Sequence, residues 1–377
     1  SPYHLYKPIS MLFVCSFDCY TDCVYCYASR ESKYSSLNWN ELKKILLEAI
    51  NELKVREIAV SGGDIFKYPY VNEFLEIISD NGYFPELPTK KPLNITTLKF
   101  LKKLGFKSFQ YSIDSFDPKY LSKHLSISNP DKYIDEIIES IHNAEKLNIK
   151  ISINSVITKL NYKGIRKFLE RILKFNNVYK VNLNPVGYSL YKRKEMQELM
   201  LTNDDYDIID KECNRIFNKA RKKIKYFKEP DRFGCCWGET TASDSIQDYM
   251  DRSLCSAYRL GFVVLPDGKV TGCEELYYDK DFIIGNLKKQ TIMEIWNSNK
   301  RKNLLQPLQN QFSKDSPCKY CDEIYFKECN EIKGRCWRES LKFYGKHDFP
   351  DYRCPLSKNI AKDKNLSISF NEFIWEI

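Results

Sequence analysis

A short apolar run followed by three cysteines decides the fold: Ser10-Met-Leu-Phe-Val14, then Cys19-Tyr-Thr-Asp-Cys23-Val-Tyr-Cys26. The apolar run predicts a strand, and the cysteines follow it in a CxxxCxxC arrangement. Three thiolates on one tight loop suit an iron–sulfur cube with one iron left open. A four-ligand zinc site would need Cys15 as its fourth ligand. Cys15 stands at the end of the strand, where we expect it to pack as a core thiol.

Strands and helices alternate through the first 185 residues. The expected strands are Ser10–Val14, Val55–Val60, Tyr83–Leu87, Lys107–Ile113, Lys150–Ile157 and Val178–Leu183. Apolar residues recur at helical spacing between them, and Asn38 with Glu41 resembles a capping box before the first such segment. This alternation predicts an α/β fold with a parallel sheet. No GxGxxG follows the first strand, which favours a full or partial (β/α) barrel with its active site at the carboxyl ends of the strands.

One face of three successive strands is polar. Its members are Gln110, Ser112 and Asp114, then Ser152 and Asn154, then Asn182 and Asn184. A parallel sheet covered by helices on both faces normally reads as a continuous apolar run. Burying unpaired polar groups there would cost ~1–3 kcal/mol each. The polar face is therefore expected to line a wet or ligand-filled lumen; the alternative is an exposed sheet face.

The cysteine triplet, with Tyr25 directly before its last member, resembles that of the radical S-adenosylmethionine (SAM) enzymes. The resemblance implies a partial (β/α)6 barrel and a 4Fe–4S cluster held by Cys19, Cys23 and Cys26. Its open iron would chelate the amino and carboxylate groups of S-adenosylmethionine. Tyr25 would then lie near the adenine.

A second match to this family follows the second expected strand, as Ser61-Gly62-Gly63-Asp64. Glycines let backbone groups approach a ligand closely. The family uses Gly-Gly-Glu here to bind the methionine amino group, which implies that role for Gly62, Gly63 and Asp64 although the acid is shorter. Alone, the segment could be an ordinary turn. In relatives, polar residues of the fourth to sixth strands hold the ribose and carboxylate. By position the candidates are Ser112 and Asn154, then Asp114, and each could instead be an ordinary lumen residue.

The C-terminal cysteines resemble the SPASM domain, a small cysteine-rich module that carries two auxiliary 4Fe–4S clusters in many radical enzymes. The segment 254–273 looks like its opening hairpin, and 284–296 like its following turn and helix. The resemblance implies an outer cluster on Cys318, Cys321, Cys329 and Cys354, and an inner one on Cys255, Cys273 and Cys336. With the barrel cluster, three 4Fe–4S clusters are expected.

The inner set is one ligand short. Some relatives carry a cysteine about six residues after the first, where this chain has Gly261. Either Cys235 or Cys236 supplies the fourth ligand, or that iron is open to a substrate thiolate. Around Cys329 the spacing also departs from the family, although longer loops can close the same ligand shell at small entropic cost. The alternative for the whole region is a pair of structural zinc sites.

Length and composition bound the organisation. The 377 residues are enough for roughly two domains. The expected division is a radical SAM barrel at 8–220, a connector at 221–251, the SPASM domain at 252–360, and a tail at 361–377 that is either an added strand or a loose end. The formal charge of +9 comes from scattered residues, so no nucleic-acid partner is expected. Neither a membrane span nor an export signal is apparent, which predicts a cytoplasmic protein.

These features predict an oxidoreductase that cleaves S-adenosylmethionine reductively and modifies a ribosomally made peptide, by a thioether or carbon–carbon cross-link or another oxidative change. A first alternative is an anaerobic sulfatase-maturing enzyme that forms formylglycine. A second is a non-catalytic iron–sulfur electron carrier or zinc-binding module. The expected partners are a peptide or protein substrate and an electron donor such as flavodoxin or ferredoxin. No recognition domain precedes Pro8 in this sequence, so the expectation is either a separate peptide-recognition protein or an N-terminal domain that this sequence lacks.

Overall fold

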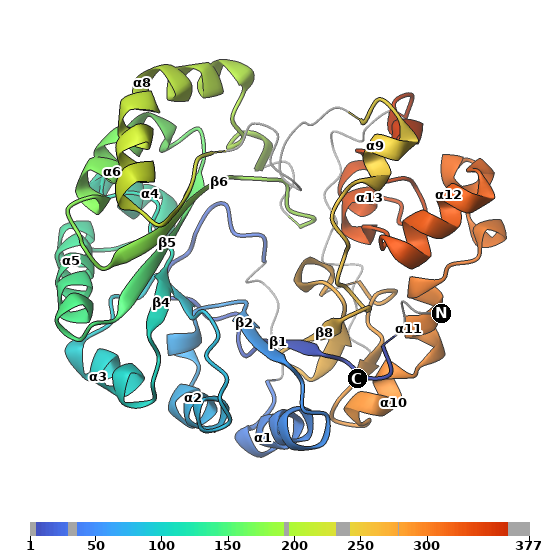
Figure 1. The fold of residues 1–377 in the computed structure, drawn as a ribbon, viewed down its shortest axis with the longest axis horizontal. Coiled ribbons are helices and arrows are strands. Elements are labelled where there is room, and N and C mark those ends of the chain that lie inside the picture. The colour runs from blue at the N-terminus through green and yellow to red at the C-terminus, as the bar shows by residue number, and fades with distance from the viewer. Residues whose placement is uncertain (1–4, 29–35, 192–195, 231–241, 278, 361–377) are drawn as a thin grey trace.

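Two five-stranded sheets form the framework of the computed structural model, which describes residues 5–28, 36–191, 196–230, 242–277 and 279–360 (Figure 1). The first sheet has the order β10-β9-β8-β1-β2 and the second the order β3-β4-β5-β6-β7. Their bounds are β1 Ser10–Val14, β2 Glu57–Ser61, β3 Pro88–Thr89, β4 Ser108–Tyr111, β5 Lys150–Ile157, β6 Val178–Pro185, β7 Tyr226–Lys228, β8 Gly261–Val264, β9 Lys269–Thr271 and β10 Gly285–Asn286. Pairing is parallel from β3 to β7 and between β1 and β2. The predicted α/β architecture is confirmed.

Helices cover the outside of these strands in the N-terminal part, and shorter helices make up much of the C-terminal part (Figure 1). They are α1 Trp39–Leu47, α2 Val71–Asp80, α3 Ile95–Lys103, α4 Pro118–Leu125, α5 Pro130–Lys146, α6 Ile165–Ile172, α8 Asn203–Lys223, α9 Ile246–Met250, α10 Ile292–Trp296, α11 Asn299–Leu305, α12 Glu323–Lys327 and α13 Trp337–Tyr344. The capping box predicted at Asn38 is present, with the Asn38 side chain accepting from Glu41 N and the Glu41 side chain accepting from Asn38 N. Helix α6 buries its four apolar residues at helical spacing, Ile165, Phe168, Leu169 and Ile172. The helices thus form where amphipathic spacing places them.

The third strand differs from its expected position. It is the short β3 at Pro88–Thr89, after rather than within the segment 83–87. Pro85 and Pro88 have no N–H to donate, so the segment cannot form a continuous ladder. Pairing with β4 is limited to Pro88 with Gln110 and Thr89 with Tyr111, beside a bond from Gln110 N to Leu87 O.

The expected connector at 221–251 contains ordered elements. Helix α8 runs to Lys223, past the expected boundary at residue 220. Strand β7 then pairs in parallel with β6, and α9 follows. Both the barrel sheet and the C-terminal region therefore extend into this segment. The tail at 361–377 lies outside the described residues.

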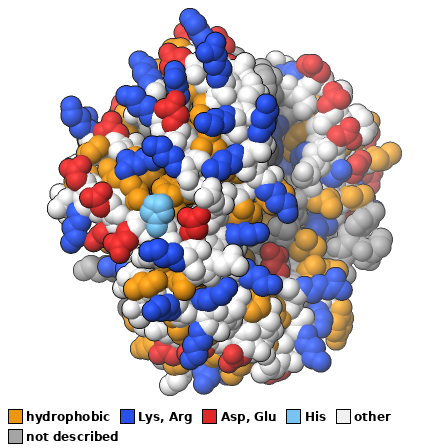
Figure 2. Space-filling model, turned by 60° about the vertical axis from the view of Figure 1, so that its left-hand side comes forward, with side chains coloured by type: hydrophobic (Ala, Val, Ile, Leu, Met, Phe, Trp, Pro, Cys, Tyr) orange, Lys and Arg blue, Asp and Glu red, His pale blue; other side chains and the backbone are white. Residues whose placement is uncertain are grey.

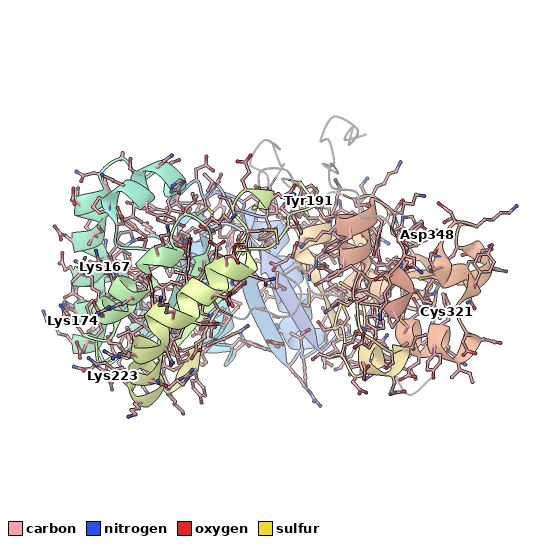
Figure 3. All side chains as sticks on the ribbon, turned by 90° about the horizontal axis from the view of Figure 1, so that it is seen from above. Lys167, Lys174, Tyr191, Lys223, Cys321 and Asp348 are labelled. Atoms are coloured by element: carbon pink, nitrogen blue, oxygen red, sulfur yellow. The ribbon has the colours of Figure 1, made fainter. Side chains whose placement is uncertain are left out.

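The C-terminal region contributes a strand to the barrel sheet. Strand β8 pairs in parallel with β1, and β8 with β9 forms the expected hairpin. A Cβ on Gly261 would lie 1.9 Å from the backbone oxygen of Ser10. The close pairing of β8 with β1 therefore excludes a cysteine at position 261. Tyr191, which lies between the two parts in Figure 3, adds a second tie because its hydroxyl donates to Glu275 O at 2.9 Å.

The surface carries both charge signs. Lys and Arg side chains are spread among Asp and Glu on the face shown in Figure 2. Among the described residues, no helix has both the length and the apolar character that crossing a bilayer requires.

Candidate active site and iron–sulfur centres

A cavity of about 740 Å³ runs through the lumen between the two sheets. All three cysteines of the triplet line it, as do Tyr25, Gly62, Gly63, Asp64, Ser112 and Asn154. Gln110 and Asn184, from the predicted polar strand face, line it too. The structure therefore brings together at one cavity nine of the ten triplet and SAM-site candidates from the sequence. The tenth, Asp114, is buried behind the wall.

The cysteine loop is held against the glycines that follow β2. Gly63 N donates to Ser16 O and Asp64 N to Asp18 O, both at 2.8 Å. A Cβ on Gly63 would lie 2.3 Å from Asp18 O, so only glycine permits this approach. Gly62 has φ +98°, a conformation that favours glycine. The Gly-Gly pair thus positions the loop that carries the cysteines.

Asp64 is committed to its own loop. Its Oδ2 accepts from Thr89 Oγ1 at 2.7 Å and from the backbone N–H groups of Lys90 and Lys91 at 3.2 Å, and its Oδ1 accepts from Phe66 N at 3.0 Å. A carboxylate has about four lone-pair sites, and four donors already face this one. Asp64 therefore braces the end of β3, mainly through Oδ2, while Oδ1 accepts a single bond and the residue lines the cavity. Its role toward the methionine amino group stays a prediction.

Asp114 lies beneath Tyr25. Its carboxylate accepts from the Tyr25 hydroxyl, from Lys90 Nζ at 2.7 Å and from Val156 N at 2.8 Å. Burial and the Asp114 carboxylate raise the pKa of Tyr25 well above its usual value, so its hydroxyl stays protonated. Asp114 fixes the ring expected to face adenine, and does so from outside the cavity.

Lys90 is a lining residue that the sequence analysis missed. Its Nζ also donates to Ser112 O at 2.5 Å. Burial alone would lower the pKa of Lys90, but the Asp114 carboxylate beside it raises that pKa above the ordinary value. The signal in the sequence was only its position directly after β3.

Polar groups at the ends of β4 to β6 pair with one another along one wall of the lumen. Gln110 Nε2 donates to Ser112 Oγ at 3.2 Å, and Asn184 donates to the side-chain oxygen of Asn154. Ser152, by contrast, is fully buried. Four of the seven residues of the predicted polar face thus line the cavity, whereas Asp114, Ser152 and Asn182 do not.

Cys15 is a core thiol. It is buried, and burial raises its pKa to about 12. It lies among apolar side chains such as Phe13, Leu37 and Leu42, and it does not line the cavity that the triplet cysteines line. This position does not support the four-ligand zinc alternative at the triplet.

The four cysteines assigned to the outer cluster surround a second cavity, of about 30 Å³. Cys318, Cys321, Cys329 and Cys354 all line it, although 36 residues separate the first from the last. Burial raises the pKa of Cys354 to about 12 and that of Cys321 to about 11, so as free thiols these side chains would be neutral. Four soft donors around one cavity fit a 4Fe–4S cluster, which takes one thiolate per iron.

The three inner-cluster candidates lie in the same region. Cys336 precedes α13, Cys273 follows β9, and Cys255 packs against Gly334, where an added Cβ would be 2.9 Å from the Cys255 Cβ. Cys235 and Cys236, the candidate fourth ligands, lie outside the described residues. Within the described ranges, no three Cys, His, Asp or Glu side chains have the arrangement of a single-ion site.

Glu274 joins the two parts. It follows Cys273, and its carboxyl accepts from the Ser61 hydroxyl and from the Tyr27 hydroxyl at 3.3 Å. Burial raises the pKa of Glu274. The inner cysteines are thus connected through one side chain to the loops that line the large cavity.

Comparison with known families matches these two sites. Residues 13–172 match the model of the radical SAM superfamily, and residues 255–322 match that of SPASM, an iron–sulfur cluster-binding domain. The chain is a radical SAM enzyme with a SPASM domain. Its cofactors are accordingly S-adenosylmethionine and iron–sulfur clusters, as the cysteine patterns implied.

Two named relatives match most of this chain. The chain is 23% identical over 340 residues to a cysteine-type anaerobic sulfatase-maturating enzyme of Clostridium novyi, covering 84% of this chain and 86% of that one. It is 26% identical over 289 residues to a GTP 3',8-cyclase of Aquifex aeolicus, covering 70% and 79%.

Solved structures confirm the fold. Streptococcus suis SuiB bound to precursor peptide SuiA superposes with a TM-score of 0.67 at 15% identity, over 94% of this chain and 77% of that one. Native anSMEcpe with bound AdoMet gives 0.61 at 18% identity, over 93% and 95%.

Proposed function

We propose that this enzyme binds S-adenosylmethionine in the 740 Å³ lumen cavity and modifies a ribosomally made peptide there. The observation that carries the proposal is the convergence on this cavity of the triplet cysteines, the Gly62–Gly63 turn and the polar ends of β4 to β6. The volume lies within the ~300–1,000 Å³ of typical ligand sites.

Each residue has a distinct part in this proposal. Cys19, Cys23 and Cys26 would hold the barrel cluster, which on reduction supplies a 5′-deoxyadenosyl radical from S-adenosylmethionine. The turn at Gly62 and Gly63 holds the cysteine loop and offers backbone groups to the methionine end. The remaining contacts come from the cavity wall.

The wall residues orient the cofactor. Tyr25, fixed by Asp114, would face the adenine, while Ser112 and Asn154 would bind the ribose and carboxylate. Lys90 adds a cation at the same wall, 13% exposed along its side chain. The protein thereby positions one carbon against one substrate hydrogen, which is the contribution a protein makes when a cofactor supplies the reactive chemistry.

A peptide substrate is supported by the solved neighbours: SuiB was captured with a precursor peptide, and anSMEcpe with AdoMet and a peptide named Cp18Cys. We further propose three 4Fe–4S clusters, an electron donor such as flavodoxin or ferredoxin, a separate peptide-recognition protein, and a cytoplasmic location.

Sulfatase maturation is a second candidate, because the Clostridium novyi relative is a cysteine-type sulfatase-maturating enzyme. Incubating the reduced enzyme with a cysteine-containing sulfatase peptide separates the two functions. Formylglycine, trapped as a hydrazone and located by mass spectrometry, supports this second candidate. A cross-link appears instead as the loss of two hydrogens from a precursor peptide, with no aldehyde that forms a hydrazone.

The common step is tested first. Anaerobically reconstituted protein, reduced and given S-adenosylmethionine, should form 5′-deoxyadenosine. A non-catalytic electron carrier or zinc module would form none. Cys23→Ala should abolish the product, while Cys15→Ala, which removes a buried thiol from the core, should retain it. Equal loss in both variants would contradict the ligand assignment.

A further inference from the structure

Two arginines donate hydrogen bonds to thiols of the outer cavity. Arg252 Nη2 lies 3.3 Å from Cys329 Sγ, and Arg335 Nη1 lies 3.4 Å from Cys318 Sγ. Arg252 comes from the segment after α9, and Arg335 directly precedes Cys336. Two different parts of the chain thus each place a cation on a sulfur of the same four-cysteine set.

These guanidinium groups are held firmly. Arg335 is 6% exposed and donates to the backbone oxygens of His347 and Phe349. Its guanidinium carbon lies 5.0 Å from the ring centroid of Phe312 and 5.0 Å from that of Trp337. Arg252 stacks at 4.0 Å on Tyr249 and donates to the backbone oxygens of Cys329 and Gly334 at 3.3 Å. Carbonyls and rings orient the cations but do not neutralise their charge.

Carboxylates near the outer cavity leave this positive charge in place. Asp351 lines the cavity, but it forms a pair with Arg353 through bonds of 2.6 and 3.0 Å. Asp322 also acts on Cys321, but it is exposed and caps α12. Solvent screens an exposed charge far more than a buried one. The outer thiols therefore face two cations in excess.

The inner thiols have a balanced environment. Arg338, the cation acting on Cys336 and Cys273, bonds Glu275 at 2.6 Å and Glu339 at 2.9 Å. Lys342 Nζ lies 2.6 Å from the second Glu275 oxygen. This buried group holds two cations and two carboxylates.

The remaining charges around the inner set also offset one another. Arg259 is the cation beside Cys255, and the Glu331 carboxylate lies near enough to Arg259 to offset its charge. Glu274 adds a carboxyl beside Cys273. Counted over the described part of the chain, the two thiol sets thus differ by about two uncompensated cations.

We propose that Arg252 and Arg335 raise the reduction potential of the outer cluster above that of the inner one, so that an electron reaching the auxiliary sites comes to rest on the outer cluster. This inference rests on the proposed function. A cation hydrogen-bonded to a thiolate stabilises the reduced, more negative form, and cluster potentials follow net charge and hydrogen bonds to sulfur. One electron passes from inner to outer cluster, the first being oxidised and the second reduced, and no bond or proton moves.

Potentiometric titration monitored by EPR tests this on the full-length chain, with the triplet cysteines replaced by alanine so that only auxiliary clusters contribute. Two waves are expected. Arg252→Met and Arg335→Met should each lower the midpoint potential of the higher wave by at least about 59 mV, which is a tenfold change in the reduced-to-oxidised ratio for one electron. Arg252→Lys and Arg335→Lys keep the positive charge, so each should keep the midpoint potential of the higher wave close to that of the unmodified chain.

Arg301→Met is the matched control. Arg301 is also buried in the C-terminal region and stacks on Trp296, but it donates to the backbone oxygens of Tyr258 and Trp296 instead of a thiol. It should leave both waves in place. A shift of the lower wave, no shift in either Met variant, or an equal shift in Arg301→Met would overturn the inference.

If a variant fails to assemble a cluster, its iron content tests the proposal in place of its potential. Loss of about four of eight irons in Arg252→Met but not in Arg252→Lys supports a requirement for a positive charge at these thiols. Equal loss in both variants contradicts the proposal, because the shape of the arginine side chain and not its charge would then be required. Failure of the proposed function looks different: the unmodified chain would form no 5′-deoxyadenosine, whatever the auxiliary potentials.

Discussion

Replacing Gly63 by alanine should selectively empty the barrel cluster site. The added Cβ would lie 2.3 Å from Asp18 O and 2.7 Å from the carbonyl carbon of Phe17, where ordinary contacts begin at 3.4 Å. Both neighbours are backbone, so the cysteine loop must move by roughly 1 Å. Such a shift disrupts the bonds Gly63 N to Ser16 O and Asp64 N to Asp18 O.

The cost follows from these contacts. Two lost backbone hydrogen bonds contribute about 0.5–1.5 kcal/mol each, and overpacking adds about 1–3 kcal/mol. The sum, about 2–6 kcal/mol, falls on the loop that carries all three ligands. The auxiliary cysteines lie elsewhere and should keep their clusters.

Iron and product analysis after anaerobic reconstitution checks this expectation. Gly63→Ala should hold about eight irons instead of about twelve and form no 5′-deoxyadenosine. Gly164→Ala is the matched control, because nothing lies within 4 Å of its added Cβ and its φ is −88°. Full iron content and normal cleavage in Gly63→Ala would refute the assignment of the loop.

Three further substitutions test other parts of the structure. Lys90→Met leaves the Asp114 carboxylate buried without its cation, so thermal unfolding of the reconstituted protein should show a free energy of unfolding lower by about 3–5 kcal/mol. If adding Asp114→Asn to this variant recovers none of that stability, the result contradicts the Lys90–Asp114 ion pair. Gly261→Cys should destabilise the β1–β8 pairing because of the 1.9 Å approach to Ser10 O, and an added inner-cluster ligand with unchanged stability would contradict that pairing. Cys329→Ala should remove about four irons while 5′-deoxyadenosine still forms, and unchanged iron content would remove Cys329 from the outer set.

Local chemistry made much of the site predictable. The CxxxCxxC loop, the glycine pair after β2 and the polar strand faces are short patterns whose residues act close to where they stand in the chain. The four cysteines that the family pattern groups into the outer set, which spacing alone does not group, line one cavity.

Other features depend on contacts between distant segments. Arg252 meets Cys329 across 77 residues, and β8 joins β1 across about 250. Lys90 carries no motif, and the hydrogen bonds that Asp64 accepts from Thr89, Lys90 and Lys91 depend on where β3 ends. Because of its prolines, β3 forms at Pro88–Thr89 and not at the expected residues 83–87. The hydrogen-bond donors to Asp64 could therefore not be predicted from the sequence.

The most direct measurement of the central claim is EPR of the reduced chain in which all seven SPASM-region cysteines are replaced, before and after S-adenosylmethionine is added. An isolated 4Fe–4S signal that changes on addition, with 5′-deoxyadenosine appearing in the same sample, is the predicted result. A signal indifferent to the added compound, or no iron–sulfur signal at all, would contradict a three-thiolate cluster in the lumen.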